Sequence, residues 1–157
     1  MEETDMSTGI KGSRENPIRS ACVTILRDGK FAAIHHAKRL QVEIAGGKQD
    51  AGETIEECAL REAREELGVE VFNLRPLYTY LGESLTGVFY FCTVFCADIR
   101  PEDDLKSSTE GLAFWATREE LITSPSDKAP DPPNRYRMHV VAITMIENKM
   151  VGGLVEP

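Results

Sequence analysis

Residues 47–53 read Gly-Lys-Gln-Asp-Ala-Gly-Glu, and after seven further residues positions 61–69 read Arg-Glu-Ala-Arg-Glu-Glu-Leu-Gly-Val. The second segment carries three carboxylates, Glu62, Glu65 and Glu66, within five residues of one predicted helix. Like charges three or four residues apart on a helix repel each other. Such a cluster favours a bound divalent cation, and ligands that are all oxygen atoms suit Mg²⁺ or Mn²⁺.

The helix that carries these carboxylates has recognisable ends. Its predicted range is 54–67, and Thr54 with Glu57 forms a capping-box pattern at the first turn. Gly68 suits the left-handed residue that commonly follows a helix. We therefore expect one continuous α-helix that starts and stops at defined residues.

Helical periodicity determines which acidic side chains share a face. Glu62 and Glu66 lie one turn apart on one face, and Glu65 lies beside them. Arg61 is four residues from both Glu57 and Glu65, so it is expected to pair with both and to orient Glu65.

A solvated acidic face is the competing interpretation of this charge run. Two features favour a site instead. Cys58 and Ala59, one turn earlier, are small and would let a loop or a ligand approach the carboxylates. Gly46 and Gly47 would let backbone atoms approach a ligand without an intervening side chain. The residues alone leave both interpretations open.

The rest of the chain predicts a strand-rich α+β domain with a few helices packed on the sheet. Residues 1–17 are polar and predict a flexible tail, which leaves 18–157 as the domain. We expect strands at 19–27, 30–36, 70–81, 85–97 and 111–116, helices at 118–122 and 136–150, and loops at 37–53, 100–109 and the proline-rich 123–135.

Composition excludes several classes of function. The net charge of -8 argues against non-specific binding to nucleic acid or to an anionic membrane, both of which require a basic surface. The four cysteines lie in apolar patterns without a Cys-x-x-Cys pair, so we expect small buried hydrophobic residues. No secretory leader or membrane-spanning run is present in the sequence, and a cytoplasmic location is the expectation.

The stretch 47–69 resembles the Nudix box: Gly, five residues, Glu, seven residues, Arg-Glu, an aliphatic residue, any residue, Glu-Glu, any residue, Gly and an aliphatic residue. Every fixed residue of the pattern is present. The one soft departure is Ala63, where a larger aliphatic residue is usual. This resemblance to MutT-like Nudix hydrolases implies an α/β/α sandwich with a mixed β-sheet flanked by helices.

The resemblance also implies an activity and a set of roles. Nudix enzymes hydrolyse a nucleoside diphosphate linked to another group X, with Mg²⁺ or Mn²⁺ as cofactor. Carried over by position, Glu62 and Glu66 would be metal ligands, Glu65 a ligand or base, and the Gly47 carbonyl a further ligand. Arg61 would hold the glutamates in place.

Two further glutamates have implied roles outside the carboxylate cluster. Glu53 would support the turn between loop and helix. Glu110, in the loop before the strand that carries Trp115, is a candidate base or extra ligand, and an ordinary loop glutamate is the alternative. The two histidines that end the second strand, His35 and His36, are expected to be surface or packing residues.

The group X is determined outside the box. The signatures of the ADP-ribose, dinucleoside polyphosphate, coenzyme A and NADH hydrolases are missing, which favours a small nucleotide such as a (d)NTP as substrate. Nucleotide sugars and ADP-ribose stay open. A Nudix-fold nucleotide-binding regulatory module is the non-enzyme alternative, although such modules commonly lose the metal glutamates. A homodimer is possible, because dimers are common in the family.

Overall fold

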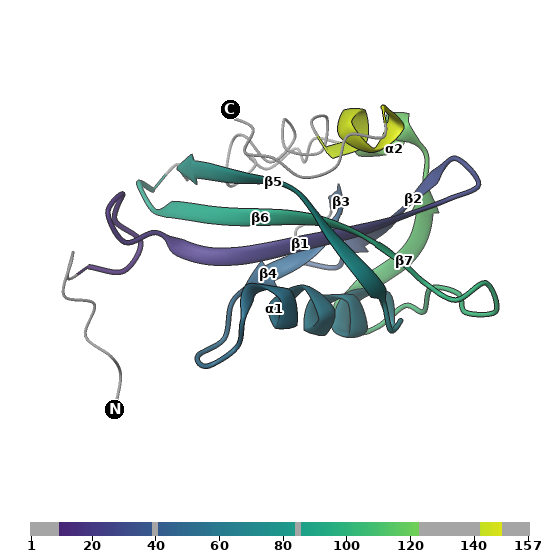
Figure 1. The fold of residues 1–157 in the computed structure, drawn as a ribbon, viewed down its shortest axis with the longest axis horizontal. Coiled ribbons are helices and arrows are strands. Elements are labelled where there is room, and N and C mark those ends of the chain that lie inside the picture. The colour runs from purple at the N-terminus through teal and green to yellow at the C-terminus, as the bar shows by residue number, and fades with distance from the viewer. Residues whose placement is uncertain (1–9, 39–40, 84–85, 123–141, 149–157) are drawn as a thin grey trace.

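The computed structural model describes residues 10–38, 41–83, 86–122 and 142–148 (Figure 1). Their fold is built mainly of strands, with short helices. The elements are β1 (Ile18–Arg27), β2 (Lys30–His36), β3 (Val42–Glu43), β4 (Ala45–Lys48), α1 (Ile55–Glu62), the π-helical turn η1 (Ala63–Leu67), β5 (Phe72–Glu83), β6 (Phe89–Asp98), β7 (Gly111–Ala116) and α2 (Arg118–Ile122).

Strand β1 is the centre of a mixed seven-stranded sheet. The order is β3-β2-β1-β6-β5, with β4 also paired to β1 and β7 to β2. β1 runs parallel to β6, from Ile18 opposite Tyr90 to Ile25 opposite Ala97. It runs antiparallel to β4 and β2. Because β4 lies directly beside the central strand, the glycines at 46 and 47 are held by sheet hydrogen bonds.

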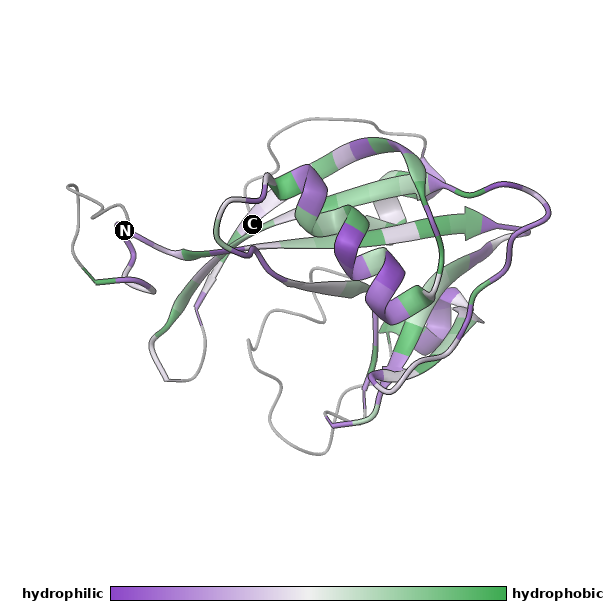
Figure 2. Ribbon diagram, turned by 90° about the horizontal axis from the view of Figure 1, so that it is seen from below, coloured by the Kyte–Doolittle hydropathy of each residue, from purple (hydrophilic) through white to green (hydrophobic). Residues whose placement is uncertain are grey.

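Two hydrophobic clusters cover the two faces of the sheet. α1 and η1 lie on one face, where Cys58, Ala59, Ala63 and Leu67 are fully buried against the strands. Figure 2 shows hydrophilic residues along α1 and hydrophobic residues in the strands behind it. α2 and the helical residues 142–147 lie on the opposite face (Figure 1). The α+β architecture expected from the sequence, a mixed sheet flanked by helices, is confirmed.

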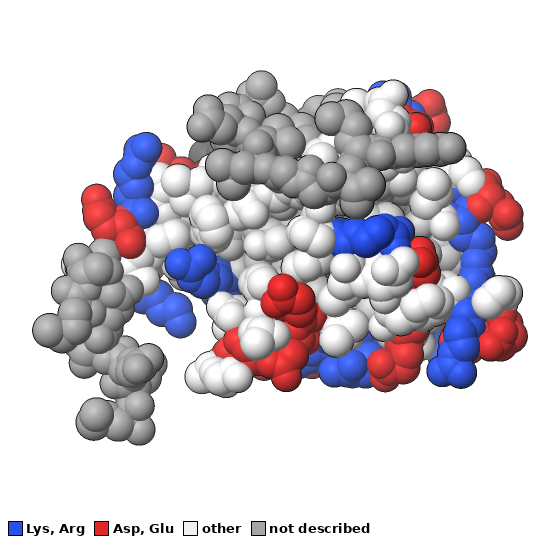
Figure 3. All heavy atoms as spheres, in the orientation of Figure 1, with Lys and Arg blue, Asp and Glu red and all other residues white. Residues whose placement is uncertain are grey.

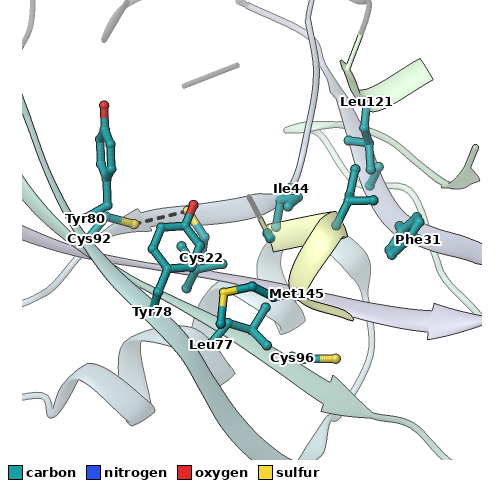
Figure 4. Close-up of a cluster of buried hydrophobic side chains, with 14 of the residues drawn as sticks. Cys22, Phe31, Ile44, Leu77, Tyr78, Tyr80, Cys92, Cys96, Leu121 and Met145 are labelled. Atoms are coloured by element: carbon teal, nitrogen blue, oxygen red, sulfur yellow. Dashed lines mark hydrogen bonds between the residues drawn. The ribbon is translucent and has the colours of Figure 1, made fainter. Parts of the chain in front are cut away.

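The cluster opposite α1 contains three of the four cysteines (Figure 4). The sulfur atoms of Cys22 and Cys92 lie 3.4 Å apart, and Cys96 is buried nearby. Cys58 lies in the other cluster. All four are buried free thiols, which confirms that they pack as small hydrophobic residues.

The structure differs from the predicted elements mainly around the glycine-rich segment. The predicted loop 37–53 contains β3 and β4. Strand β4 has little intrinsic preference for a β-strand, and it pairs with β1 because its glycines permit close approach. A Cβ atom on Gly46 would lie 2.6 Å from the Cys22 sulfur. The predicted strand at 70–81 corresponds to β5, whose pairing with β6 shifts register between Phe72 and Arg75 and again between Pro76 and Tyr78.

Several predicted segments lie wholly or partly outside the described residues. These include residues 1–9 of the predicted tail and the proline-rich segment 123–135. Residues 10–16 form a turn, and the Gly12 carbonyl accepts a hydrogen bond from the Phe89 amide at 2.8 Å. The predicted helix 136–150 is described only at 142–148. Within the described ranges, none of the helices has the length and apolarity needed to cross a membrane.

Candidate active site

The ends of helix α1 are built as its sequence predicts. The Thr54 hydroxyl accepts a hydrogen bond from the Glu57 amide at 3.0 Å, and the Glu57 carboxylate accepts one from the Thr54 amide at 2.8 Å. Gly68 has a φ of 67°, and a Cβ there would lie 2.9 Å from the Lys106 carbonyl oxygen. The predicted capping box and glycine C-cap are therefore both confirmed, and they determine where the carboxylates lie along the helix.

The last turn of this helix is a π-helix and not the α-helix expected from the sequence. η1 covers 63–67 and includes Glu65 and Glu66. A π-turn holds an additional residue per turn, and such turns occur often at functional sites. The Gly46 amide donates to Oε1 of Glu66 at 2.7 Å, which connects the turn to β4. Glu66 is thus held at the sheet, while Glu65 stays exposed.

In strand β4, Gly46 and Gly47 lie directly beside the carboxylates of Glu66 and Glu62. A Cβ atom on Gly47 would collide with Oε1 of Glu62 and would lie 2.7 Å from its Cδ. The Gly47 carbonyl oxygen lies 3.5 Å from the Cys58 sulfur, which donates to it. The absence of a side chain at Gly47 is therefore what allows the Glu62 carboxylate to approach the backbone of β4 this closely.

Glu62 and Glu66 are buried carboxylates. Their exposed fractions are 7% and 2%. Burial raises the pKa of Glu62, and the Arg61 guanidinium partly opposes that change. Burial also raises the pKa of Glu66 to about 8, the Gly46 amide opposes it, and the charges of Glu62 and Glu43 add to it. A carboxylate pair in this environment is unfavourable without a cation.

Arg61 is the positive centre of the site. Its guanidinium binds both oxygens of Glu53, at 3.0 and 2.8 Å, in a bidentate pair. It also donates to Glu62 at 3.0 Å, to Glu65 at 3.1 Å and to the Lys48 carbonyl at 2.9 Å. One side chain thus connects the loop, the helix and two candidate ligands.

Two expectations about this network have different outcomes. The predicted pair of Arg61 with Glu65 is confirmed. The predicted pair with Glu57 is wrong, because the Glu57 carboxylate is used in the capping box and Arg61 binds Glu53 instead. The hydrogen bonds from Arg61 and from the Asp50 amide lower the pKa of Glu53 to about 2, so this carboxylate stays ionised.

Glu110 approaches the buried carboxylates from another part of the chain. Its carbonyl accepts a hydrogen bond from the Ala37 amide at 2.9 Å, which joins the loop before β7 to the end of β2. Oxygens of Glu66 and Glu110 and a ring nitrogen of His36 lie within 4.8 Å of one another. The structure therefore connects Glu62 and Glu65 through Arg61, and it brings Glu110 close to Glu66; the Gly47 carbonyl faces the Cys58 sulfur.

His36 and Glu43 were not predicted as site residues. His36 is 6% exposed and Glu43 is 4% exposed. Glu43 lies in β3 opposite Ile34 of β2, two residues before His36. Alternation along β2 places Ala32, Ile34 and His36 on one face, and Ala32 packs in the cluster beneath α1. That alternation was the signal in the sequence that could have identified His36.

The donor set fits a hard divalent cation. Oxygens of Glu66 and Glu110 lie within 4.8 Å of each other, and the charge of Glu62 also acts on Glu66; carboxylate oxygens of this kind suit Mg²⁺ or Mn²⁺. Figure 3 shows acidic side chains gathered on the side of the molecule where α1 and the loop before it lie, with basic side chains beside them. The residues can therefore hold a metal ion and, through it, the oxygens of a phosphate.

Comparison with known proteins matches residues 16–139 to the family described as NUDIX domain. A curated relative named "Uncharacterized Nudix hydrolase YvcI", from Bacillus subtilis (strain 168), is 28% identical over 93 residues, which cover 56% of this chain and 58% of that protein. The match therefore spans less than two thirds of this relative's length.

Solved structures are similar in fold. A NUDIX hydrolase from Nitrosomonas europaea has a TM-score of 0.64 and 21% identity, and the match covers 85% of this chain and 88% of that one. A MutT NUDIX hydrolase from Burkholderia pseudomallei has a TM-score of 0.63 and 22% identity, with 80% and 97% covered. A UDP-X diphosphatase has a TM-score of 0.69 and 15% identity, with 90% and 68% covered.

Proposed function

We infer the activity of this chain from one premise: it belongs to the NUDIX domain family. We propose that it is a metal-dependent hydrolase that cleaves a pyrophosphate bond in a nucleoside diphosphate linked to a group X. The observation that carries the proposal is the buried pair Glu62 and Glu66, held against the glycines of β4 with Arg61 beside them.

The proposed metal ligands are the Gly47 carbonyl and the carboxylates of Glu62, Glu65 and Glu66. When bound, Mg²⁺ or Mn²⁺ supplies positive charge that neutralises phosphate oxygens as the P–O bond breaks. Arg61 keeps Glu62 and Glu65 in place through its hydrogen bonds at 3.0 and 3.1 Å. The arrangement is therefore preorganised before the substrate arrives, which lowers the cost of reaching the transition state.

The general base must lie within hydrogen-bond reach of the attacking water, whose proton it accepts. Glu65 and Glu110 are both exposed, whereas Glu66 is buried. We propose that Glu62 and Glu66 serve as ligands and that a carboxylate oxygen of Glu110 takes this proton, or one of Glu65 if Glu65 is the base and not a ligand. Removing each of the two exposed carboxylates separately distinguishes them, because the base contributes about 10² to 10⁴ in rate.

The proposed substrate is a small nucleotide, most simply a (d)NTP. Nucleotide sugars and ADP-ribose are the alternative substrates. Nucleotide sugars are included in the test because the fold is similar to that of a UDP-X diphosphatase. We propose that the protein acts on free nucleotides and not on nucleic acid, given its net charge of -8. The free buried cysteines are consistent with the proposed cytoplasmic location, and a homodimer stays a prediction.

The test is a product assay with wild type, Glu66→Gln and Glu56→Gln. Glu56 is an exposed residue of the same helix, so its variant is the matched control for the same chemical change. Each protein is incubated with Mg²⁺ or Mn²⁺ and a panel of (d)NTPs, ADP-ribose, nucleotide sugars and dinucleoside polyphosphates.

We expect metal-dependent cleavage of one class of compound by wild type and Glu56→Gln, and its loss in Glu66→Gln. Cleavage that survives in Glu66→Gln would contradict the proposed site. Tight binding of a nucleotide without turnover by the folded wild type would favour the regulatory-module alternative over the hydrolase.

A further inference from the structure

His36 lies at the meeting point of three chain segments. It ends β2, where it pairs with Gly111 of β7. The next residue, Ala37, donates its amide to the Glu110 carbonyl at 2.9 Å. A ring nitrogen of His36 lies within 4.8 Å of carboxylate oxygens of Glu66 and Glu110. At first sight the three side chains form a metal-binding triad.

The backbone contact of the His36 ring contradicts that interpretation. The Lys38 amide donates to Nδ1 of His36 at 3.1 Å. A backbone N–H can only donate, so Nδ1 offers its lone pair and carries no proton. The proton of the neutral ring is then on Nε2. Metal-binding histidines usually have the reverse arrangement, in which the second ring nitrogen donates its N–H to a neighbouring acceptor.

We propose that His36 is a positioning residue, whose Nε2–H is directed to the carboxylates of Glu66 and Glu110, and that it is not a metal ligand. The inference rests on the proposed function, because it assigns a role within the same site. It goes further by stating which atom of which side chain orients the carboxylates.

A neutral donor suits this location for an electrostatic reason. Glu66 is buried beside Glu62 and Glu43, so it gains from every hydrogen bond that favours its ionised form. A positively charged side chain would also stabilise the carboxylate, but it would repel an incoming cation. A neutral imidazole N–H supports the carboxylate without that repulsion.

The Glu110 carboxylate is exposed, so it needs to be held in one orientation and does not need its charge stabilised. Its backbone is held by the Ala37 amide, but its side chain is exposed. With a His36 ring nitrogen within 4.8 Å of a Glu110 carboxylate oxygen, the ring is close enough for its N–H to restrict this side chain, directly after a small rotation or through one water. His36 would thereby couple the exposed carboxylate of Glu110 to the buried carboxylate of Glu66.

The tautomer can be measured directly on the full-length protein. Nitrogen chemical shifts of ¹⁵N-labelled histidine rings distinguish Nε2–H from Nδ1–H and from a metal-bound nitrogen. The chain has three histidines, so a His36→Gln spectrum assigns the signal by its disappearance. We expect the Nε2–H tautomer in the metal-free protein and its retention when Mg²⁺ is added. Loss of the Nε2 proton on adding Mg²⁺ would overturn the proposal.

Variants test the positioning role. His36→Gln keeps an N–H donor at a similar reach, His36→Leu removes it, and His35→Gln is the exposed neighbouring control. We expect the Leu variant to lose roughly 10- to 100-fold in Mn²⁺ affinity or in kcat, while the Gln variant regains most of that loss. Equal losses in the Gln and Leu variants, with equally lowered Tm, would mean a purely structural role and would overturn the proposal.

The ring shifts and the Mn²⁺ affinity, followed by electron paramagnetic resonance, require no substrate. A protein that hydrolyses nothing in the panel would contradict the proposed function, and these two measurements would still decide the role of His36.

Discussion

Replacing Glu66 by Gln is expected to abolish hydrolysis and at the same time to stabilise the metal-free protein. The carboxyl group is 2% exposed, and its pKa is raised from 4.5 to about 8 because it is buried. Gln has nearly the same shape, and its carbonyl oxygen can still accept the hydrogen bond from the Gly46 amide. The variant therefore removes the unfavourable charge and keeps the packing.

The direction of the stability change follows from the pKa of Glu66 in the unfolded chain, 4.5, and in the folded chain, about 8. Below pH 4.5 the carboxyl is protonated in both the folded and the unfolded chain, and it adds no pH-dependent penalty. As the pH rises to about 8 the unfolded chain releases this proton and the folded chain keeps it, so the free energy of unfolding falls. At about 1.4 kcal/mol for each tenfold change in proton affinity, the upper bound of the penalty is about 5 kcal/mol.

Thermal unfolding in EDTA at pH 5 and pH 8 measures this effect. We expect Glu66→Gln to exceed wild type by about 2–4 kcal/mol at pH 8, and by much less at pH 5. For a chain of this size that corresponds to a Tm higher by roughly 5–15 °C at pH 8. Glu65→Gln, the same change at the exposed neighbouring residue, should alter stability by less than about 0.5 kcal/mol.

Two results would refute this reasoning. A Glu66→Gln protein no more stable than wild type at pH 8 would mean that the carboxylate is well solvated or compensated without metal. A gain of the same size at both pH values would assign the effect to packing and not to a proton. Saturating Mg²⁺ should reverse the order of stability, because only wild type offers the ionised ligand.

Three further predictions concern the parts that hold the carboxylates. Arg61→Lys cannot reproduce the bidentate contact with Glu53, so Mn²⁺ affinity measured by electron paramagnetic resonance should fall roughly tenfold or more; an unchanged affinity would show that the network is dispensable. Gly47→Ala should weaken Mn²⁺ binding by roughly 10- to 100-fold, because the new methyl group displaces Glu62; its circular dichroism should stay native, and wild-type binding would contradict the predicted collision. Thr54→Ala should lower stability in urea by about 1 kcal/mol through loss of the cap, with metal affinity changed much less; a large loss of affinity at unchanged stability would oppose this assignment.

Local patterns explain why so much of the helix and its carboxylates could be predicted from the sequence. The cap at Thr54, the stop at Gly68 and the shared face of Glu62 and Glu66 each depend on residues within two turns of one another. Such spacings are independent of the rest of the fold. The predicted outlines of β2, β7 and α2 agree with the structure for the same reason, since turn residues and caps lie next to them.

The features that the sequence did not predict depend on contacts between distant segments. His36 approaches Glu66 only because β2 pairs with β7 and packs over η1, and one strand read alone contains no such information. The π-turn at 63–67 likewise contains Glu66, which accepts a hydrogen bond from Gly46, twenty residues earlier in the chain. Arg61 pairs with Glu53 and not with Glu57, because the Glu57 carboxylate accepts the hydrogen bond from the Thr54 amide in the capping box.

The parallel pairing of β1 with β6 has a consequence for how the chain acquires its site during synthesis. Ile18 pairs with Tyr90, so the whole segment carrying the glycines and the carboxylates emerges from the ribosome before its supporting sheet can close. Pairings between distant segments are slow, since a long loop must first be ordered. A nascent chain ending before residue 89 would contain the complete motif next to an unpaired edge of β1, where aggregation or a chaperone competes with folding. Residues 47–69 are therefore synthesised before β6, and the carboxylate site forms only after β6 has paired with β1.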